Sequence, residues 1–361
     1  MIIKELDIEN FRNIEKLNIM PCENVNVIFG ENAQGKTNII ESIWLFTGCR
    51  SFRGSKDKEL INFEKEKAKI RLNFISGKRN QSMKIEIGEK KLISLNGIDF
   101  QNPAKSIGEF TAVVFSPVHL SLIKDGPAER RKFLDTAISQ LRPQYASYLS
   151  KYSRIITQRN AVLKDIPHNS ELYDMLDIFD EEAAAYAAKI AFYRTSYLEK
   201  LSEEVTEIYA GISSGREKFS LDYIQCDEKE NFTSKEAYLE KIRKARKNDI
   251  MTGTTSVGTH REDIEIKING NSARKFGSQG QQRSCALALK LGEASMIKNT
   301  SSEQPVALLD DVMSELDISR QDYILNHIRD WQVFITCCDP NTILHLKEGK
   351  SFHIKNGNIT V

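Results

Sequence analysis

The stretch Gly30-Glu-Asn-Ala-Gln-Gly35-Lys36-Thr37 decides the fold of this chain. It fits the pattern GxxxxGK[ST], in which glycines let the backbone curl so that successive N–H groups face a phosphate. The apolar run Val25–Phe29 precedes it and predicts a strand. The residues that follow it have the spacing of one helix face: Ile39, Ile40, Ile43, Trp44 and Phe46. Because a helix N-terminus adds a positive end, the sequence predicts a loop in which Lys36 reaches the β- and γ-phosphates of a nucleotide. The Thr37 hydroxyl is expected to bind Mg²⁺.

A phosphate loop of this kind needs a distant acid to hold the magnesium ion. The run Val306-Ala-Leu-Leu-Asp310-Asp311 predicts a buried strand that ends in two acids. We expect Asp310 to be a magnesium ligand, directly or through water, and Asp311 to act beside the attacking water as a base or an orienting group. The alternative is a strand that ends in Asp for solubility. The cofactors predicted are therefore ATP and Mg²⁺.

A second candidate anion site begins at Ser278-Gln-Gly280-Gln281, ahead of the apolar helix from Cys285 to Leu289. A serine and a glycine at a helix start bind anions for the same reasons as the phosphate loop, although such a serine is often only a helix cap. Its position before the Asp310 strand makes it informative. Ser314-Glu-Leu-Asp317 follows that strand at once, and Thr336 closes the next one.

Composition limits the class of protein. The chain has 361 residues, with 51 Lys+Arg against 50 Asp+Glu and a net charge of +1, which excludes a polybasic nucleic-acid wrapper but not a local basic patch. Hydrophobic residues make up 40% and charged residues 28%, as is ordinary for globular proteins. No apolar run approaches the roughly 18 residues of a membrane helix. The N-terminus lacks a signal-peptide pattern and the cysteines lack metal-ligand spacing, so we expect a reduced, cytoplasmic protein.

The pattern along the chain predicts one α/β domain interrupted by a helical block. Short strand-like runs at 68–75, 83–87 and 91–95, with a turn at Asn96-Gly97, predict an added antiparallel β segment. From about residue 118 the residue pattern predicts helices. The expected division is an ATP-binding lobe I over 1–117 and 300–361, and a mainly helical lobe II over 118–299.

The sequence also contains an apolar stripe and basic patches whose roles the pattern alone does not decide. A stripe at helical spacing is read as core packing between two helices of a short antiparallel arm: Phe179, Ala183, Tyr186, Ile190, Tyr193 and Tyr197. The basic run 241–247 is a solvated helix face or a DNA contact. Another candidate DNA patch comprises Arg50, Arg53, Lys56 and Lys58.

The motifs and their order resemble the ABC-ATPase heads of the SMC-type DNA-maintenance proteins and, in detail, the RecF family of recombination mediators. Five features carry the resemblance: Asn10-Phe-Arg12-Asn13, Gly126-Pro-Ala-Glu-Arg130-Arg131-Lys-Phe-Leu-Asp135, Gln158-Arg-Asn160, Gly258-Thr-His260-Arg-Glu-Asp263, and the Ser278 signature. Gln279 stands where many ABC heads have Gly, and Asp311 where many have Glu. The role of the His260–Asp263 motif is not assigned, and no Q-loop glutamine is identified.

The resemblance implies an α/β fold, an ABC-ATPase head (a P-loop NTPase) with the antiparallel β segment and an inserted helical second lobe. It implies an ATP-dependent homodimer in which each phosphate loop is completed by Ser278, Gly280 and Gln281 of the other copy. Lys36 and Asp311 would be the catalytic residues, and Thr37 and Asp310 the Mg²⁺ ligands. The remaining nucleotide contacts implied are Gly30, Glu31, Asn32, Ala33, Gln34, Gly35 and Arg12.

The function implied is ATP-dependent DNA binding in recombinational repair and replication-fork maintenance. The expected targets are single-stranded and gapped DNA and duplex/single-strand junctions. The expected partners are RecO and RecR, with loading of RecA and support of the SOS response. The ATPase would be a weak, DNA-stimulated switch. Two alternatives are an ABC transporter motor subunit, against which Asp311 and the long helical stretch argue, and a metabolic P-loop kinase, which would need no signature helix.

Overall fold

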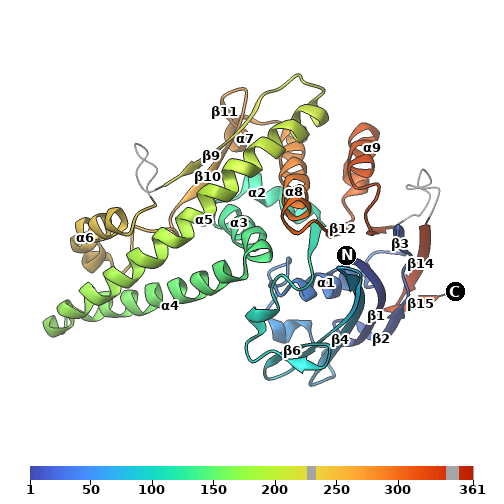
Figure 1. Cartoon of the computed structure of the whole chain (residues 1–361), viewed down its shortest axis with the longest axis horizontal. Coiled ribbons are helices and arrows are strands. Elements are labelled where there is room, and N and C mark those ends of the chain that lie inside the picture. Colours follow the sequence, from blue (N-terminus) through green and yellow to red (C-terminus); the bar gives the residue numbers. More distant parts are fainter. Residues whose placement is uncertain (226–232, 339–348, 361) are drawn as a thin grey trace. The chain divides into compact units, whose positions relative to one another are not determined.

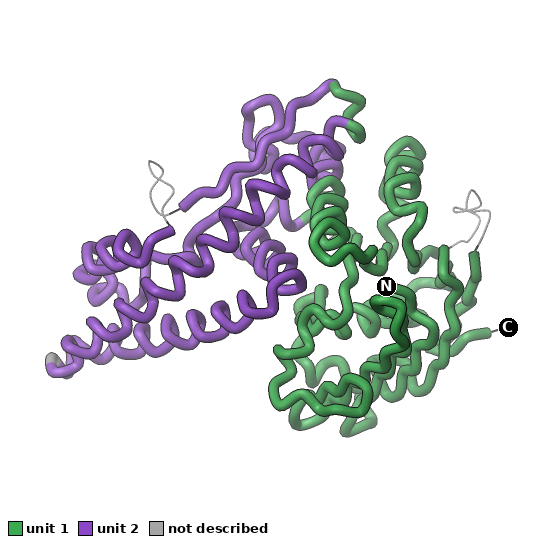
Figure 2. The backbone as a smooth tube through the Cα atoms, viewed as in Figure 1, with its two compact units in different colours: residues 1–120, 211–215, 286–361 green, residues 121–210, 216–285 purple. Residues whose placement is uncertain are grey.

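The computed structural model of the chain describes residues 1–225, 233–338 and 349–360. It forms two compact units, coloured green and purple in Figure 2. Unit 1 comprises residues 1–120, 211–215 and 286–361, and unit 2 comprises residues 121–210 and 216–285. The functional lobe limits expected from the sequence stay a prediction, because compactness alone defines these units. None of the described helices could span a membrane.

The antiparallel sheet of unit 1 confirms the predicted β segment. Its strand order is β2-β1-β4-β5-β6-β7, and every neighbouring pair is antiparallel. Asn96 and Gly97 have φ of +51° and +81°, the left-handed values of a tight hairpin turn between β6 and β7. The strands are β1 (Ile2–Phe11), β2 (Ile14–Ile19), β4 (Ala68–Ser76), β5 (Arg79–Ile87), β6 (Lys91–Leu95) and β7 (Ile98–Asp99).

The second sheet of unit 1 is mostly parallel and has the order β15-β14-β3-β13-β12-β8. All neighbours pair in parallel except β14 and β15. The carboxyl ends of β3, β13 and β12 therefore meet at one edge, where ligands of open α/β sheets bind. The strands are β3 (Val25–Phe29), β8 (Ala112–Phe115), β12 (Val306–Asp310), β13 (Val333–Cys337), β14 (Gly349–Lys355) and β15 (Asn358–Thr360).

Helix α1 (Lys36–Trp44) is buried between these two sheets. Ile39, Ile40 and Ile43 are fully buried in a core that also includes residues of β1, β4, β8 and β12. Glu41 is fully buried in the same helix, so its carboxylate needs a partner inside the fold. The C-terminal part of α8 (Gln279–Ser301) and α9 (Ile318–His327) complete the helices of unit 1.

Unit 2 is built mainly of helices, and α4 runs beside α5 (Figure 1). A three-stranded antiparallel sheet, β11-β10-β9, is an addition that the prediction of a mainly helical lobe did not specify. The elements are α2 (Ser121–Lys124), α3 (Pro127–Leu141), α4 (Pro143–Asp165), α5 (Tyr173–Ser213), β9 (Phe219–Ile224), α6 (Lys235–Thr252), β10 (Asp263–Ile268), β11 (Asn271–Ser272) and α7 (Ala273–Phe276).

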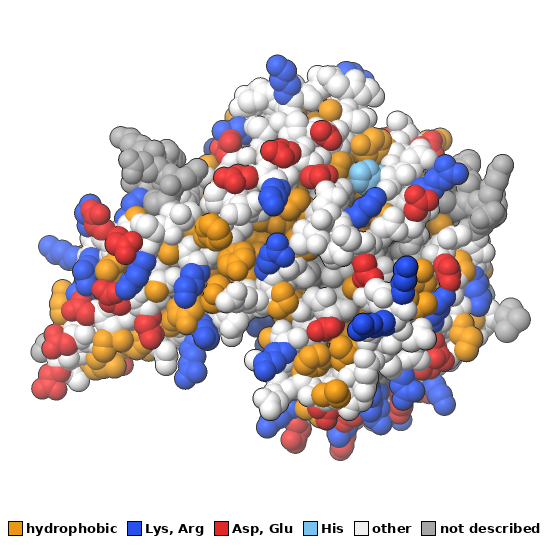
Figure 3. All heavy atoms as spheres, in the orientation of Figure 1, with side chains coloured by type: hydrophobic (Ala, Val, Ile, Leu, Met, Phe, Trp, Pro, Cys, Tyr) orange, Lys and Arg blue, Asp and Glu red, His pale blue; other side chains and the backbone are white. Residues whose placement is uncertain are grey.

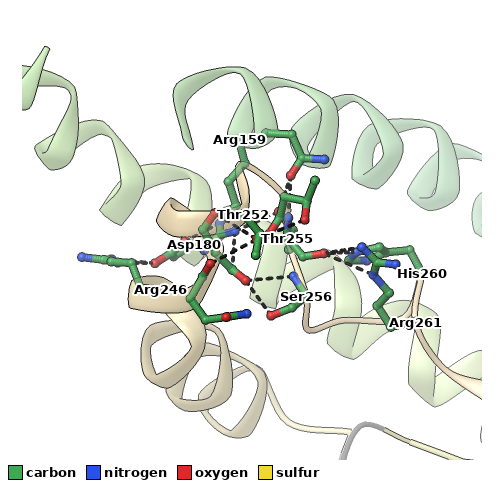
Figure 4. A network of polar contacts seen from close by, with 12 residues as sticks. Arg159, Asp180, Arg246, Thr252, Thr255, Ser256, His260 and Arg261 are labelled. Atoms are coloured by element: carbon green, nitrogen blue, oxygen red, sulfur yellow. Dashed lines mark hydrogen bonds and ion pairs between the residues drawn. The ribbon is translucent and has the colours of Figure 1, made fainter. Parts of the chain in front are cut away.

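A buried ion-pair network joins α4, α5 and α6 (Figure 4). Arg159 is fully buried, with Nε 2.7 Å from Oδ1 of Asp180 and Nη1 2.8 Å from Oδ2 of Asp249. The same Nη1 donates to the Thr255 hydroxyl at 2.8 Å, and Arg246 adds a second cation to Asp180. We call these five residues the Arg159 network. Its charges are compensated by one another, as burial requires.

Candidate nucleotide-binding site

The loop between β3 and α1 has the backbone that its glycines predict. Gly30 and Gly35 have φ of +148° and +110°, values that side chains with a Cβ rarely adopt. A Cβ on Gly30 would lie 2.3 Å from the carbonyl oxygen of Ile354. Gly35 is the N-cap of α1, and within the described residues no side chain caps that helix. The first amides of α1 are therefore left for an anion.

The Lys36 side chain is buried in this loop without a carboxylate partner among the described residues. Its Nζ donates to the carbonyl oxygens of Gly30 at 2.6 Å and Glu31 at 2.8 Å, and lies 3.8 Å from Sγ of Cys338. Carbonyl oxygens orient the ammonium group but leave its net charge uncompensated. The arrangement suits a cation that pairs with an anionic ligand.

Thr37 and Asp310 meet as the sequence predicts. The Thr37 hydroxyl donates to Oδ1 of Asp310 at 2.8 Å, and the Thr336 hydroxyl donates to the same oxygen at 2.9 Å. Asp310 is 5% exposed, and its burial raises the pKa of this carboxyl while the two hydroxyl donors oppose that shift. A buried carboxylate beside a threonine hydroxyl is an oxygen set that fits Mg²⁺. Within the described parts of the chain there is no cluster of three or more His, Cys, Asp or Glu able to hold a metal, so a metal here would need further oxygens from its ligand.

Asp311 stands next to this pair in a left-handed backbone conformation, with φ of +54°. Its amide donates to the Thr336 hydroxyl at 2.9 Å, and its carbonyl accepts from the Ser314 hydroxyl at 2.9 Å. The chain therefore turns sharply at the end of β12, and Asp311 is half-buried rather than enclosed.

Arg12 is held beside the loop by an acid that sequence reasoning missed. Its Nε lies 2.6 Å from Oε2 and its Nη2 3.0 Å from Oε1 of Glu41, a bidentate pair. Ser51 donates to the same carboxylate, and Arg53 Nη1 lies 3.7 Å from it. The only signal for Glu41 in the sequence is an acid within an apolar helix, which predicts a buried partner but does not name it.

Asn13 is a second residue that sequence reasoning left without a role. Its Oδ1 accepts from Nδ2 of Asn38 at 2.7 Å, and its Nδ2 donates to the Ala33 carbonyl at 3.5 Å. A Cβ on Gly35 would lie 2.9 Å from the same Oδ1. Asn13 thus supports the phosphate loop from behind. The neighbouring Asn32 and Gln34 bond to Cys338 and to the Asn356 amide.

The signature residues lie in unit 2, at the start of α8. The Ser278 hydroxyl accepts from the Gln281 amide at 3.2 Å, while Oε1 of Gln281 accepts from the Ser278 amide at 2.7 Å. This reciprocal pair is a capping box. Ser278 is exposed and Gly280 half-buried, so this helix start lies at the surface, with the Gln281 amide already bonded within the capping box.

The motif from Gly258 to Asp263 has a structural explanation. Asp263 makes a bidentate pair with Arg130, at 2.7 and 2.8 Å. His260 contacts the Tyr152 hydroxyl at 2.8 Å and the Thr255 carbonyl at 3.1 Å, and burial lowers its pKa to about 4. Since a carbonyl only accepts, Nε2 carries a proton, and the lowered pKa favours the neutral ring near pH 7. Both residues hold the 253–263 loop in place.

The two proposed basic patches differ in how far their cations are paired within the fold. Arg50, Arg53, Lys56 and Lys58 are all exposed, and Arg53 donates to Asn38 at 3.1 Å beside the phosphate loop. In the run 241–247, three cations bond to acids of unit 2: Arg243, Lys244 and Arg246. The solvated-face interpretation of that run fits these contacts better than a DNA contact.

The chain matches the family described as RecF/RecN/SMC N terminal domain over residues 2–359. It is 40% identical over 367 aligned residues to the DNA replication and repair protein RecF of Agathobacter rectalis, covering 100% of this chain and 99% of that protein. It is 42% identical to the protein of the same name from Clostridium acetobutylicum, with 99% of each chain covered.

The chain belongs to the RecF family.

Solved structures agree with this assignment. A RecF–ATP complex, described as the recombination mediator protein of the RecFOR pathway, matches with a TM-score of 0.92 at 38% identity, covering 99% of this chain and 97% of that one. The Smc head domain of Pyrococcus furiosus matches at 16% identity with a TM-score of 0.57, which shows a shared fold. The prediction of an ABC-ATPase head is confirmed.

Membership of the RecF family leaves the role of each site residue a prediction. The structure brings Thr37, Asp310 and Thr336 into contact and places Lys36 in the same loop. It holds Arg12 at the end of β1 through Glu41.

Proposed function

We propose that this RecF-family protein binds ATP with Mg²⁺ at the loop between β3 and α1 and acts in DNA replication and repair. The observation that carries the proposal is the hydrogen bond of 2.8 Å between Thr37 and Asp310 at the mouth of that loop. This bond joins the threonine and the aspartate that would hold the Mg²⁺ of a nucleotide, although the two residues lie far apart in the sequence. The relatives named RecF and the ATP complex support the same assignment.

Each residue of the site has a part in this proposal. Lys36 pairs with the β- and γ-phosphates, and the first amides of α1 donate to them. Thr37 and Asp310 would hold Mg²⁺, which supplies positive charge to the γ-phosphate when bound. Arg12, fixed by Glu41, adds a further cation toward the phosphates. The carboxylate of Asp311 orients the attacking water, and its short reach suits slow hydrolysis.

We further propose that ATP controls association. A signature at an open helix start, Ser278 to Gln281, completes the phosphate site of a second copy and is supported by its exposure. Charge-assisted hydrogen bonds from both copies to one nucleotide favour the dimer by linkage. Hydrolysis removes the γ-phosphate contacts and the dimer relaxes.

The ATP-dependent dimer is also proposed to act on DNA. The dimer would bind single-stranded and gapped DNA and duplex/single-strand junctions in the cytoplasm, act with RecO and RecR in loading RecA, and support the SOS response. Its weak ATPase would be stimulated by DNA. Phosphate contacts would make this binding sensitive to salt.

The test is molar mass by light scattering with and without ATP–Mg²⁺. Wild type is expected to be monomeric alone and dimeric with nucleotide, whereas Ser278→Arg stays monomeric but binds ATP normally. A wild-type chain that stays monomeric with saturating nucleotide would contradict the association step. Loss of ATP binding by Ser278→Arg would contradict the assignment of the signature to the other copy.

A further inference from the structure

One face of unit 2 combines aromatic rings and lysines on the two long helices. Tyr148 and Lys151 of α4 lie beside Tyr186, Lys189 and Tyr193 of α5, next to Phe192. We call these six residues the aromatic–lysine face. In Figure 3, hydrophobic and Lys or Arg side chains lie together over α4 and α5.

This face includes the part of the α5 stripe that is only half-buried. Ala183, Ile190 and Tyr197 of the stripe are buried as expected. Tyr186 and Tyr193 pack on Tyr148 of α4, with ring centroids 6.0 and 6.2 Å away, and are half-buried. Phe192 is 58% exposed, which is unusual for so large an apolar side chain.

The rings hold the two lysines in place. Nζ of Lys189 lies 5.1 Å from the centroid of the Tyr148 ring and 5.2 Å from that of Tyr186. Nζ of Lys151 lies 5.8 Å from the Tyr186 centroid. These are cation–π distances, so both ammonium groups are partly ordered before any ligand arrives. A fixed cation loses less side-chain entropy when it binds an anion.

Neither lysine has an acidic partner in the part of the chain that the structure describes. Within residues 1–225, 233–338 and 349–360, Lys151 and Lys189 form no ion pair, and both are exposed. The cations of the 241–247 run differ in this respect, since Arg243, Lys244 and Arg246 bond to acids. The aromatic–lysine face therefore keeps positive charge next to accessible rings.

Single-stranded nucleic acid offers the matching chemistry. Its phosphates pair with lysines and its unpaired bases stack on aromatic rings, whereas the bases of a duplex are already stacked on each other. We infer that the aromatic–lysine face binds single-stranded DNA, with Phe192 stacking on a base and Lys151 and Lys189 pairing with the backbone. The inference rests on the proposed function in DNA repair and adds a site to it.

The test measures binding of a fluorescent oligo(dT) and of a matched duplex to full-length protein over a range of salt. Phe192→Ala is expected to weaken oligo(dT) binding about tenfold, since one stacked base contributes about five- to hundredfold, and to leave the duplex nearly unaffected. Lys151→Ala with Lys189→Ala should reduce the slope of log affinity against log salt by about 1.4, because each phosphate that a lysine no longer neutralises lowers that slope by about 0.7.

Matched variants separate aromatic stacking from apolar contact and from a general loss of surface rings or charge. Phe192→Trp keeps a ring and should retain affinity, whereas Phe192→Leu keeps an apolar side chain without one and should behave like Phe192→Ala. Phe63→Ala, at a fully exposed phenylalanine of unit 1, and Lys105→Ala should change nothing.

The results distinguish failure of the proposed function from failure of the inferred DNA site. If wild type binds no DNA of any kind, the proposed function itself fails. If wild type binds oligo(dT) and Phe192→Ala binds equally well, the inferred site is wrong. Full affinity of Phe192→Leu for oligo(dT) would show apolar contact in place of stacking and contradict the inferred role of the ring. A change in oligomeric state of Phe192→Ala without DNA would make the face a protein interface and overturn the inference.

Discussion

The phosphate loop of unit 1 and the Arg159 network of unit 2 use similar residues in opposite ways. Both contain a buried cation, Lys36 in the loop and Arg159 in the network. Arg159 has two carboxylate partners within 2.8 Å, whereas the partners of Lys36 in the described residues are two carbonyl oxygens and the Cys338 sulfur. A paired buried charge supports the fold, and an oriented but uncompensated one remains available to a ligand. Substitutions in the network should therefore change stability, and those in the loop should change ATP binding.

The largest effect is expected from Arg159→Leu. It leaves Asp180 and Asp249 buried without their shared cation, which should lower the free energy of unfolding by about 3–5 kcal/mol. Denaturant unfolding followed by circular dichroism measures this. Lys244→Ala, which removes an exposed pair with Glu240, is the matched control and should cost less than about 1 kcal/mol. Equal losses for both variants would break the distinction between the two regions.

The second-largest effect is a loss of stability at low pH caused by His260, which lies in the loop that the Arg159 network holds. Its folded pKa is about 4 against an ordinary value of 6.5, because burial disfavours the charged ring. The unfolded chain therefore takes up a proton below pH 6.5 while the folded chain does not. The free energy of unfolding is therefore unaffected by protonation of His260 above pH 6.5. It falls by about 3 kcal/mol as the pH drops to about 4. His260→Gln should show a shallower pH dependence of unfolding, and an unchanged one would refute the assignment.

Lys36→Met should show the opposite behaviour to Arg159→Leu. Loss of the ammonium group should weaken ATP binding about 10- to 100-fold, since a hydrogen bond to a charged group contributes about 1.5–3 kcal/mol. The free energy of unfolding should change by less than about 1 kcal/mol, because no carboxylate is left unpaired. Calorimetric titration with ATP and denaturant unfolding of the same variant check both statements. A large loss of stability with normal ATP affinity would reverse the comparison.

The smallest effect is expected from Asn13→Ala, which removes the support behind the phosphate loop. The loop would lose the hydrogen bonds of Asn13 with Asn38 and Ala33, and ATP affinity should fall severalfold, for about 1 kcal/mol of hydrogen bonding. Asn18→Ala, at an exposed asparagine of β2, is the control for the removal of an amide. A variant with full ATP affinity would show that the loop holds its shape without Asn13.

The sequence predicts the phosphate loop well because its chemistry is contiguous and its flanking periodicities are strong. Asp310 follows from the rule that the carboxyl ends of parallel strands meet at one edge. Glu41 could not be predicted, because its partner Arg12 lies in the turn after β1 and the pairing depends on how α1 packs between two sheets.

The Arg159 network of unit 2 could not be predicted either, because it depends on how three helices pack. Arg159, Asp180 and Asp249 belong to three different helices. From sequence alone, a charged residue on a helix is expected to be exposed. The sheet of unit 2 did leave a signal, since Ile264, Ile266 and Ile268 alternate as a half-buried strand does.

The most direct test of the central claim mixes two variants that should each fail to dimerise alone. If ATP is shared between the phosphate loop of one copy and the Ser278 signature of another, Lys36→Met and Ser278→Arg together form one complete site from their intact halves. Light scattering of the equimolar mixture with ATP–Mg²⁺ should then show a heterodimer, although either variant alone stays monomeric. A mixture that stays monomeric, under conditions where wild type dimerises, would contradict the account.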